Sequence, residues 1–362
     1  MRRELLIAAG PGEWRAAWLE DGAAVELYVE RGDILPAGST HPGRVVRRVA
    51  GLGAALVDIG DERPGFLPLR RSDPRLDEGA RVVVTVRREA QGGKGALLSR
   101  AETAAVEPVA GFAAALGLRL PGNPERIEVD DAAALRELRA AFPEADAAQR
   151  DPALWPVDLD ALFATALAPS LALADGGTIH IEEGRTAVLI DVDSGSPESG
   201  SPERAALAVN LAAAAAIARQ LRLRQLGGGI VADFVGLDSR RARDEVRQAM
   251  AGALTADPAQ PRVLGWSRLG HLEIVRPRRL RPLAEAMQGP VALAFAALRT
   301  LAREARADPA ANWRLTVDPG VAAALSGPAA AALRGLETRL GRTILVSETA
   351  ARAAPPFDIA AR

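Results

Sequence analysis

The sequence predicts a multidomain protein of the α+β and α/β type, in which a small β-barrel near the N-terminus precedes a mixed-sheet domain and a small C-terminal α/β domain. Three observations indicate this. The chain has 362 residues, enough for two or three domains with hydrophobic cores. Several short β-type segments follow one another in residues 36–100. A strand, a long helix and a second strand then follow in residues 188–234.

Residues 1–35 and 36–100 both have β-type patterns. The first part alternates at 4–8, 15–20 and 25–29, with glycine in the turns, and we expect these strands to pack on the central domain. The second part has five short segments, at 44–49, 54–59, 65–69, 80–87 and 94–98. Five short strands over about 65 residues favour a closed barrel of the oligonucleotide-binding type.

Residues 101–170 carry the least information about function. Alanine-rich helical segments at 132–141 and 159–167 alternate with proline and acidic loops, and nothing there indicates catalysis. We expect a short helical connecting region.

The central part, residues 171–282, places aspartates inside apolar, β-branched runs. Asp is depleted from strands because its side chain resists burial and competes with the backbone. Side chains alternate along a strand, so Asp191 and Asp193 share one face, about 6.6 Å apart, while Val188, Ile190 and Val192 point the other way.

A third aspartate, Asp233, ends the next apolar run. Between the runs, Ser201 is the expected N-cap of a helix that ends at the glycines from Gly227 onward. Such a strand–helix–strand crossover can bring Asp191 and Asp233 together. Two interpretations stay open on spacing alone: a site for one hard cation such as magnesium, or aspartates that cap strand ends or pair with arginines.

Residues 283–362 predict the small C-terminal domain. A helix is expected at 291–306, a strand at 313–317, helices at 321–325 and 329–340, and a strand at 343–346.

Composition excludes several classes of site and of protein. Without cysteine the chain has no disulfide, no thiolate chemistry and no cysteine-ligated zinc. Its three scattered histidines disfavour a histidine-rich metal site, and we expect structural roles for them. No apolar run is long enough to span a bilayer and the N-terminus does not resemble a signal peptide, so we expect a cytoplasmic protein with no membrane partner.

The net charge of −1 argues against a surface that binds nucleic acid everywhere. Arginine forks bind phosphate, however, so local clusters can still serve RNA. The clustered arginines are Arg219, Arg222, Arg224, Arg268, Arg276, Arg278, Arg279 and Arg281.

Four motifs resemble the bacterial ribonuclease E/G family. Residues 190–195 (IDVDSG) resemble its first catalytic strand, and Asn210-Leu211 with residues 217–228 (IARQLRLRQLGG) its following helix. Residues 230–234 (IVADF) are similar to its second catalytic strand, and residues 266–274 (WSRLGHLEI) to the strand that closes its catalytic domain. The motifs are long, ordered and spaced as in the family.

The resemblance implies a magnesium-dependent endoribonuclease that cleaves single-stranded RNA in RNA processing or decay. It implies a catalytic role for Asp191, Asp193 and Asp233, with Asp191 and Asp233 as magnesium ligands and Asp193 at a supporting position usually filled by Asn. Gly236 and Ala213 stand where the family typically has acidic residues.

The barrel carries a resemblance of its own. Residues 55–60 and 65–69 resemble the S1 RNA-binding domain, in which Phe66 and Lys94 match positions that contact RNA. Leu56 stands where an aromatic platform is common, and Phe66 can also be interpreted as a core residue. Together with these two, Arg219, Arg222 and Arg268 are the expected RNA-binding residues.

Two parts of the family pattern are missing. Residues 101–170 are shorter than the region that holds the family's 5′-monophosphate sensor, and Arg185-Thr186 lies in the hairpin before Asp191, where we reject it as that sensor. The family's cysteine zinc link is replaced by residues 282–289. Because the small C-terminal domain contributes to oligomerisation in the family, a homo-oligomer would form here without zinc.

Two alternatives stay open. One is a catalytically degenerate RNA-binding protein of the same family, which the changes at Leu56, Ala213 and Gly236 favour. The other is a phosphoesterase that acts on DNA or on a small phosphorylated substrate.

Overall fold

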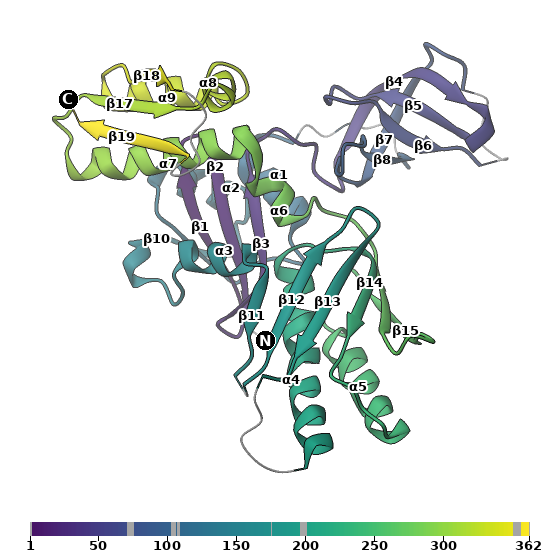
Figure 1. The fold of residues 1–362 in the computed structure, drawn as a ribbon. Coiled ribbons are helices and arrows are strands. Elements are labelled where there is room, and N and C mark those ends of the chain that lie inside the picture. Colours follow the sequence, from purple (N-terminus) through teal and green to yellow (C-terminus); the bar gives the residue numbers. More distant parts are fainter. Residues whose placement is uncertain are drawn as a thin grey trace.

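The computed structural model describes residues 2–70, 76–102, 106, 109–174, 176–195, 201–349 and 356–361. Within these residues the chain forms three sheets and one closed barrel, arranged as separate parts around a central N-terminal sheet (Figure 1). The predicted mixed α+β architecture is confirmed.

The N-terminal sheet has five strands in the order β10-β9-β1-β2-β3. The three strands predicted in residues 1–35 are all present, as β1 (Arg3–Gly10), β2 (Glu13–Glu20) and β3 (Ala23–Glu30). The other two, β9 (Arg126–Val129) and β10 (Asp146–Gln149), were not expected. Each has only four residues, too few to show an alternating pattern, so the pairing partner decides their conformation.

Residues 111–167 therefore complete the N-terminal sheet as well as connecting it to the central domain. β9 pairs in parallel with both β1 and β10. The predicted helices at 132–141 and 159–167 are observed with those bounds. The helical elements of this region are α1 (Gly111–Arg119), α2 (Ala132–Ala141), the 3-10 helix η2 (Pro152–Leu154) and α3 (Leu159–Leu167).

Five strands close the barrel in the order β4-β5-β6-β8-β7. Val82, Val84 and Val86 alternate into its core, as expected for half-buried strands. The last strand starts three residues later than predicted, because Lys94 forms an isolated bridge with Gln91 before it. The barrel strands are β4 (Thr40–Val49), β5 (Ala54–Asp58), β6 (Gly65–Pro68), β7 (Arg81–Arg88) and β8 (Leu97–Arg100).

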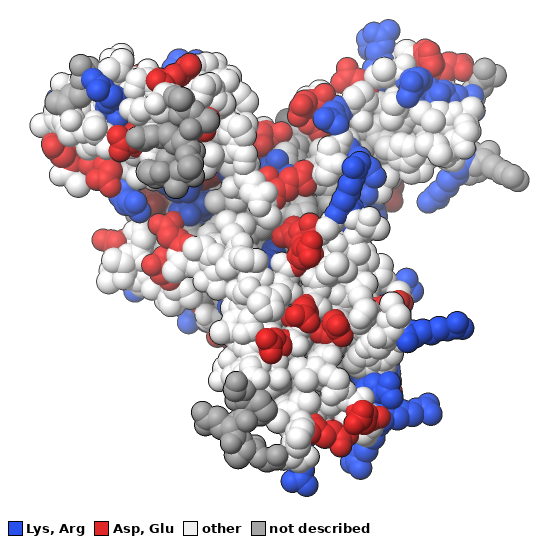
Figure 2. All heavy atoms as spheres, viewed as in Figure 1, with Lys and Arg blue, Asp and Glu red and all other residues white. Residues whose placement is uncertain are grey.

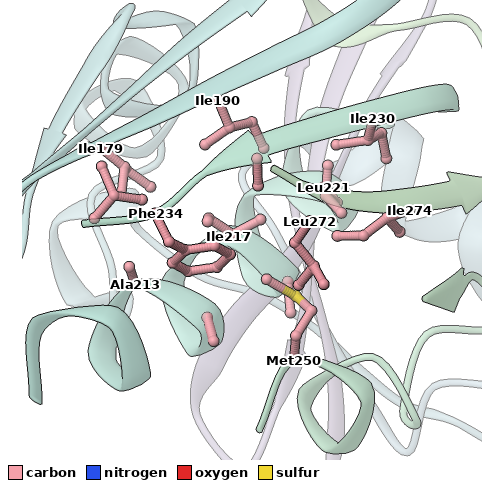
Figure 3. Packing of buried hydrophobic residues seen from close by; sticks show 14 of the residues in the cluster. Ile179, Ile190, Ala213, Ile217, Leu221, Ile230, Phe234, Met250, Leu272 and Ile274 are labelled. Carbon is pink, nitrogen blue, oxygen red and sulfur yellow. The ribbon is translucent and has the colours of Figure 1, made fainter. Parts of the chain in front are cut away.

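The central sheet has six strands in the order β11-β12-β13-β14-β16-β15. Two helices, α4 (Pro202–Leu223) and α5 (Arg240–Ala253), cover one face of it. Side chains of these helices meet strand side chains in one apolar cluster (Figure 3). The strands are β11 (Ser170–Ala172), β12 (Thr178–Glu183), β13 (Ala187–Asp193), β14 (Gly228–Asp233), β15 (Arg262–Trp266) and β16 (Leu272–Arg276).

The crossover through α4 agrees with the expectation, because β13 and β14 are neighbours and run in parallel. The strand expected over 266–274 is instead a hairpin: β15 ends at Trp266 and β16 begins at Leu272, with a turn between them. A bulge at Gly265, whose φ is 129°, interrupts the pairing of β15 with β16. The α4 helix is long and apolar enough to cross a membrane, but 61% of its most apolar stretch is buried inside the protein, as in a core helix.

The end of α4 differs from the expected glycine stop. Gln225, not Gly227, takes the left-handed conformation, with φ of 56°. The amides of Gln225 and Leu226 donate to the carbonyls of Arg222 and Leu221, which makes a Schellman motif. At Gly228 a Cβ would lie 2.5 Å from Arg278, so this glycine serves the close approach of the next segment instead.

The C-terminal domain packs three helices and a three-stranded sheet of order β18-β17-β19, and α7 connects it to the N-terminal sheet (Figure 1). Its predicted helices and strands are present. One further strand, β19, pairs with β17 and was not expected. The elements from residue 283 onward are α6 (Leu283–Met287), α7 (Gly289–Ala307), β17 (Trp313–Val317), α8 (Pro319–Ser326), α9 (Ala330–Leu340), β18 (Leu345–Glu348) and β19 (Phe357–Ala361).

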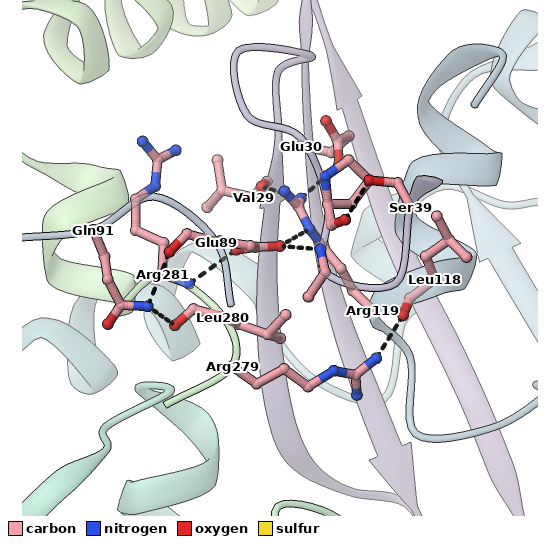
Figure 4. A network of polar contacts seen from close by, with 12 residues as sticks. Val29, Glu30, Ser39, Glu89, Gln91, Leu118, Arg119, Arg279, Leu280 and Arg281 are labelled. Atoms are coloured by element: carbon pink, nitrogen blue, oxygen red, sulfur yellow. Dashed lines mark hydrogen bonds and ion pairs between the residues drawn. The ribbon is translucent and has the colours of Figure 1, made fainter. Parts of the chain in front are cut away.

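A buried ion-pair network connects the barrel to the N-terminal sheet (Figure 4). The guanidinium of Arg119 lies 2.5 Å from Glu30 at the end of β3 and 2.7 Å from Glu89 just after β7, and all three side chains are at most 6% exposed. The second oxygen of Glu89 accepts from the amide of Arg281 at 2.9 Å. Arg119 of α1 thus fixes the end of the barrel against the end of β3, and Glu89 adds a contact to the segment before α6.

Replacing Arg119 with Met should destabilise the protein by about 3–5 kcal/mol near pH 7, because two buried carboxylates lose their counter-charge. Burial already raises the pKa of Glu30 above its ordinary value of 4.5, while the charge of Arg119 opposes the shift. A raised pKa contributes stability below the ordinary value that is lost as the pH rises through the folded-state value. The deficit of Arg119→Met in denaturant unfolding should therefore shrink as the pH falls from 7 towards 4.5, because Glu30 of the variant takes up its proton first.

Arg247→Met is the matched control, because Arg247 forms an exposed pair with Asp244 at 3.5 Å. Its loss should cost less than about 0.5 kcal/mol at any pH. Equal losses in the two variants, or a deficit of Arg119→Met that does not change with pH, would contradict the role given to the buried pair.

Candidate active site on the open face of the central sheet

Asp191 and Asp233 lie side by side on neighbouring strands. In the parallel register of β13 and β14 they are directly opposite each other, and neighbouring strands are about 4.8 Å apart. Both side chains are exposed, whereas Val188, Ile190 and Val192 on the other face of β13 are buried. The alternation expected from the sequence is therefore observed, and the crossover brings the two aspartates together.

The apolar cluster beneath this pair makes its position rigid. Ile190 and Ala232, which precede the aspartates on their strands, pack with Ile217 and Leu221 of α4. Figure 3 shows Ile190, Ile217 and Leu221 among the apolar side chains packed between sheet and helix. Ala213 stands where the resemblance implies an acidic residue. It is fully buried in the same cluster, so the presence of alanine there takes no carboxylate away from the open face.

Two histidines extend the pair into a row across the sheet. His180 on β12 is opposite Asp191, and Nε2 of His271 lies 3.6 Å from Oδ2 of Asp233. The imidazole of His180 also hydrogen-bonds the hydroxyl of Ser170 at 2.7 Å. The order along the row is His180, Asp191, Asp233, His271.

These histidines were not predicted as site residues, because they are scattered along the sequence and a lone histidine on a strand usually has a structural role. His180 alternates with the apolar Ile179 and Ile181, which predicts that its side chain is exposed. Only the strand order shows that it shares a face with Asp191 on the neighbouring strand. The third histidine, His41, lies in the barrel, 2.6 Å from the hydroxyl of Ser39.

The row lines a hollow of about 580 Å³ on the open face. Glu182 and the half-exposed Leu189 complete its acidic and apolar lining. Figure 2 shows acidic side chains gathered over the strands of this face, between patches without charge. The carboxylates of this hollow would repel an anion that binds alone. They suit a cation, which can in turn bind an anionic ligand.

Asp193 lies at the end of β13 on the same exposed face but outside the lining of the hollow. Its Oδ1 accepts from the amide of Gly195 at 2.9 Å, which fixes the backbone that leaves the strand. The residues that follow, 196–200, lie outside the described part of the chain.

The donor chemistry of the site fits a hard cation. Two adjacent carboxylates supply oxygen ligands, and a magnesium ion in proteins is commonly held by one or two carboxylates with water and substrate phosphate. Among the described residues, Asp, Glu and His side chains form no group of three that would enclose a metal on their own. An open site of this type leaves coordination positions for a substrate.

Arg268 and Leu269 stand at the tip of the β15–β16 turn, next to this row, and Leu269 is 83% exposed. The turn is held by hydrogen bonds between Ser267 and His271 in both directions. At its base, the indole of Trp266 donates to the carbonyl of Arg243. Arg268 therefore projects from a well-anchored turn.

Arg219 and Arg222 do not join the acidic pair. Both belong to α4, on the opposite side of the sheet, and point to the N-terminal sheet. Arg219 donates to the carbonyl of Ala24 at 3.0 Å. Arg222 is buried and bonds Glu20 and Glu26 at 2.7–3.1 Å. The expectation that Arg222 holds RNA is wrong, because its guanidinium is already fully bonded.

Phe66 lies on the outside of the barrel. It is half-buried and opposite Leu56 in the β5–β6 register, while its neighbour Leu67 is part of the barrel core. The core interpretation of Phe66 is therefore wrong.

Lys94 is exposed and lines a hollow of about 490 Å³ where the barrel meets the central sheet. Arg88, Arg185 and Arg278 line the same hollow, and burial together with the charge of Arg278 lowers the pKa of Arg88. Figure 2 shows basic side chains at this junction, beyond the acidic side chains of the sheet.

Part of the chain is similar to a known protein family. Residues 122–279 match the model of the ribonuclease E/G family. Ribonuclease E of Nostoc sp. is 40% identical over 131 residues, which is 36% of this chain and 19% of that protein. Ribonuclease E of Haemophilus influenzae is 24% identical over an alignment that takes 99% of this chain and 52% of that protein. Ribonuclease G of Salmonella typhimurium is 26% identical over 56% of this chain and 44% of that protein.

The chain thus spans between about a fifth and about half of the length of these relatives. The alignment with the Haemophilus influenzae protein runs over 492 positions, whereas the chain has 362 residues, so the relative has extra segments inside the aligned region. The range matched by the family model, residues 122–279, includes β13 and β14, which carry the aspartate pair, and α4 between them. Over residues 122–279, which carry the aspartate pair, the chain is therefore similar to the ribonuclease E/G family.

Proposed function

We propose that the protein is a magnesium-dependent endoribonuclease that cleaves single-stranded RNA. The observation that carries the proposal is the register of β13 and β14, which sets Asp191 against Asp233 on an exposed face. The relatives named ribonuclease E and ribonuclease G support the choice of substrate.

Asp191 and Asp233 would hold the metal ion through their carboxylate oxygens. When bound, magnesium would supply Lewis-acid stabilisation of a phosphodiester and a more acidic water. The rigid strands and the apolar cluster below keep the two carboxylates at a fixed separation, so that little reorganisation is needed when substrate binds.

The neighbouring residues position this pair. Asp193, bonded to the amide of Gly195, would order the backbone beside the reacting phosphate. His271, close to Oδ2 of Asp233, would orient that carboxylate. Arg268 at the tip of the anchored turn would bind the backbone of the RNA strand, since a guanidinium fork matches phosphate.

The barrel would bind the strand before it reaches the acidic pair. Phe66 offers an aromatic face on the outside of the barrel, and Lys94 stands at the junction between barrel and sheet. Arg88, Arg185 and Arg278, which have no ion-pair partner among the described residues, line that junction together with Glu183 and Glu285 and would bind phosphates. The single-stranded substrate would thus run from the barrel through a basic junction to an acidic row.

The main alternative is a family member that binds RNA without cleaving it. The buried position of Ala213 weakens that alternative, because an acid there would not reach the open face. The phosphoesterase alternative needs no barrel. Deleting the barrel would leave Arg119 and Glu30 without Glu89, so single substitutions on its surface are the better test.

Asp191→Asn and Asp233→Asn should each abolish magnesium-dependent cleavage of a single-stranded oligonucleotide, because each removes a ligand charge while keeping the shape of the side chain. The fold should be unchanged or slightly more stable without metal, since two like charges no longer repel each other. Asp193→Asn should keep substantial activity, because an amide oxygen can still accept from the amide of Gly195. The measurement is the cleavage rate with magnesium and with chelator.

Asp244→Asn on α5, at the other face of the sheet, is the control and should cleave at the wild-type rate. The catalytic assignment fails if both aspartate variants cleave like the wild type. Absence of cleavage by the wild type, with RNA still bound, would favour the non-catalytic alternative.

His271→Ala should lower the cleavage rate by about 10–100-fold, the usual cost of removing a group that orients a metal ligand. It should also raise the magnesium concentration needed for half the maximal rate. Glu273→Gln, two residues away on the same open face and outside the hollow, should change neither quantity. An unchanged magnesium dependence in His271→Ala would exclude the positioning role.

Phe66→Ala should weaken RNA binding by about 1–3 kcal/mol, the value of one base stacked on an aromatic ring. Binding is measured in the Asp191→Asn background, so that no cleavage occurs. Leu52→Ala, which removes an exposed apolar side chain elsewhere on the barrel, serves as the control. If the two variants bind RNA equally well, the barrel does not bind through Phe66, and the phosphoesterase alternative gains support.

A further inference from the structure

A second hollow, of about 540 Å³, lies between the N-terminal sheet and the C-terminal domain. None of the residues that line it belongs to the acidic row. Its walls come from the β1–β2 turn, from the segment between η2 and α3, and from one side of α7. In Figure 1, α7 lies across the end of β1 and β2, where these segments meet.

Five arginines line it. Arg299, Arg303 and Arg306 follow one another at helical spacing along α7, so they share one side of the helix. Arg339 comes from α9 and Arg15 from β2. Five guanidinium groups from three elements thus converge on one space.

The carboxylates of the hollow do not balance these charges. Asp160 is shared between Arg15, at 2.6 Å, and Arg303, at a loose 3.5 Å. Asp130 and Asp158 accept from the backbone amides of Ala9 and Ala161.

Several of the arginines are loosely held. Among the described residues, Arg306 has no ion-pair partner, and Arg339 lies 4.0 Å from Asp131. Arg299 is held more firmly, by an ion pair with the buried Glu13, although burial lowers its pKa. The lining thus holds five arginines against three aspartates, and Glu13 neutralises one further arginine.

The floor of the hollow contains donors without partners. The side chain of Arg15 is only 6% exposed, and its Nε has no hydrogen-bond acceptor within the described residues. The same holds for the indole nitrogen of the buried Trp155, on the opposite wall. Buried donors that lack acceptors are costly, and an anionic ligand can offset that cost.

We propose that this hollow is a binding site for a phosphate group. Converging arginine forks match a doubly charged oxyanion in geometry and charge. The apolar residues Pro152, Ala153 and Val157 leave one wall for the uncharged part of the ligand, and the volume is that of a site for a small organic molecule. The phosphate comes either from a free phosphorylated molecule or from an RNA strand. The site does not depend on the aspartate pair.

The test is calorimetric titration of the full chain with three probes: inorganic phosphate, adenosine monophosphate and a single-stranded RNA oligonucleotide. The RNA titration uses the Asp191→Asn background, so that cleavage and binding are separated. The variant is Arg303→Ala combined with Arg306→Ala. Arg303 is 67% exposed and Arg306 is exposed too, and alanine favours the helix, so the fold should be kept. Arg334→Ala on α9, outside the hollow, is the matched control.

The double variant should bind at least one probe about tenfold more weakly or worse, as expected for lost charged hydrogen bonds, while the control binds like the wild type. Weaker binding of phosphate or adenosine monophosphate identifies a free phosphorylated molecule as the ligand. Weaker binding of the oligonucleotide alone identifies an RNA phosphate. The proposal is overturned if no probe distinguishes the double variant from the wild type, or if Arg334→Ala weakens binding equally, which would indicate only a general charge effect.

Discussion

The arrangement of the protein depends on one buried guanidinium, that of Arg222 near the end of α4. It bonds Glu20 on β2 and Glu26 on β3, so the helix that supports the central sheet is fixed to the N-terminal sheet as well. Burial alone would lower the pKa of Arg222, but the two glutamates raise it, so the group stays charged at every accessible pH. Loss of one partner would leave an unpaired charge in the interior.

The same device recurs at other junctions. Arg119 bonds glutamates from the N-terminal sheet and the barrel, and Arg276 at the end of β16 bonds the buried Asp257 at 2.7 Å. Arginine suits these places because its planar fork satisfies two carboxylates or a carboxylate and a carbonyl at once. Many of the arginines that give the sequence its basic clusters are therefore structural. The position of an arginine along the chain therefore does not by itself indicate a surface for RNA.

The sequence was informative where a pattern is local. Alternation on β13 was enough to predict which side chains face the solvent, and Ser201 with Pro202 marked the start of α4. It was less informative where a partner distant in the chain decides the outcome. The short strand β9 forms because β1 offers it an edge, and β10 pairs in turn with β9. The proximity of His180 and His271 to the aspartates follows from a strand order that no single segment encodes. The left-handed turn at Gln225 was missed because three glycines follow it, of which Gly227 and Gly228 allow the close approach of Arg278 instead.

The bulge at Gly265 has a consequence for the outer edge of the central sheet. β15 is the last strand on that side, and an edge strand exposes unpaired amides and carbonyls that can pair with a strand of another molecule. The positive φ of Gly265 and the shifted register break the straight row of these groups. Without this irregularity, the exposed Leu264 beside Gly265 would favour pairing of the edge with another molecule. The irregular hairpin that carries Arg268 thus also protects the protein against edge-to-edge aggregation.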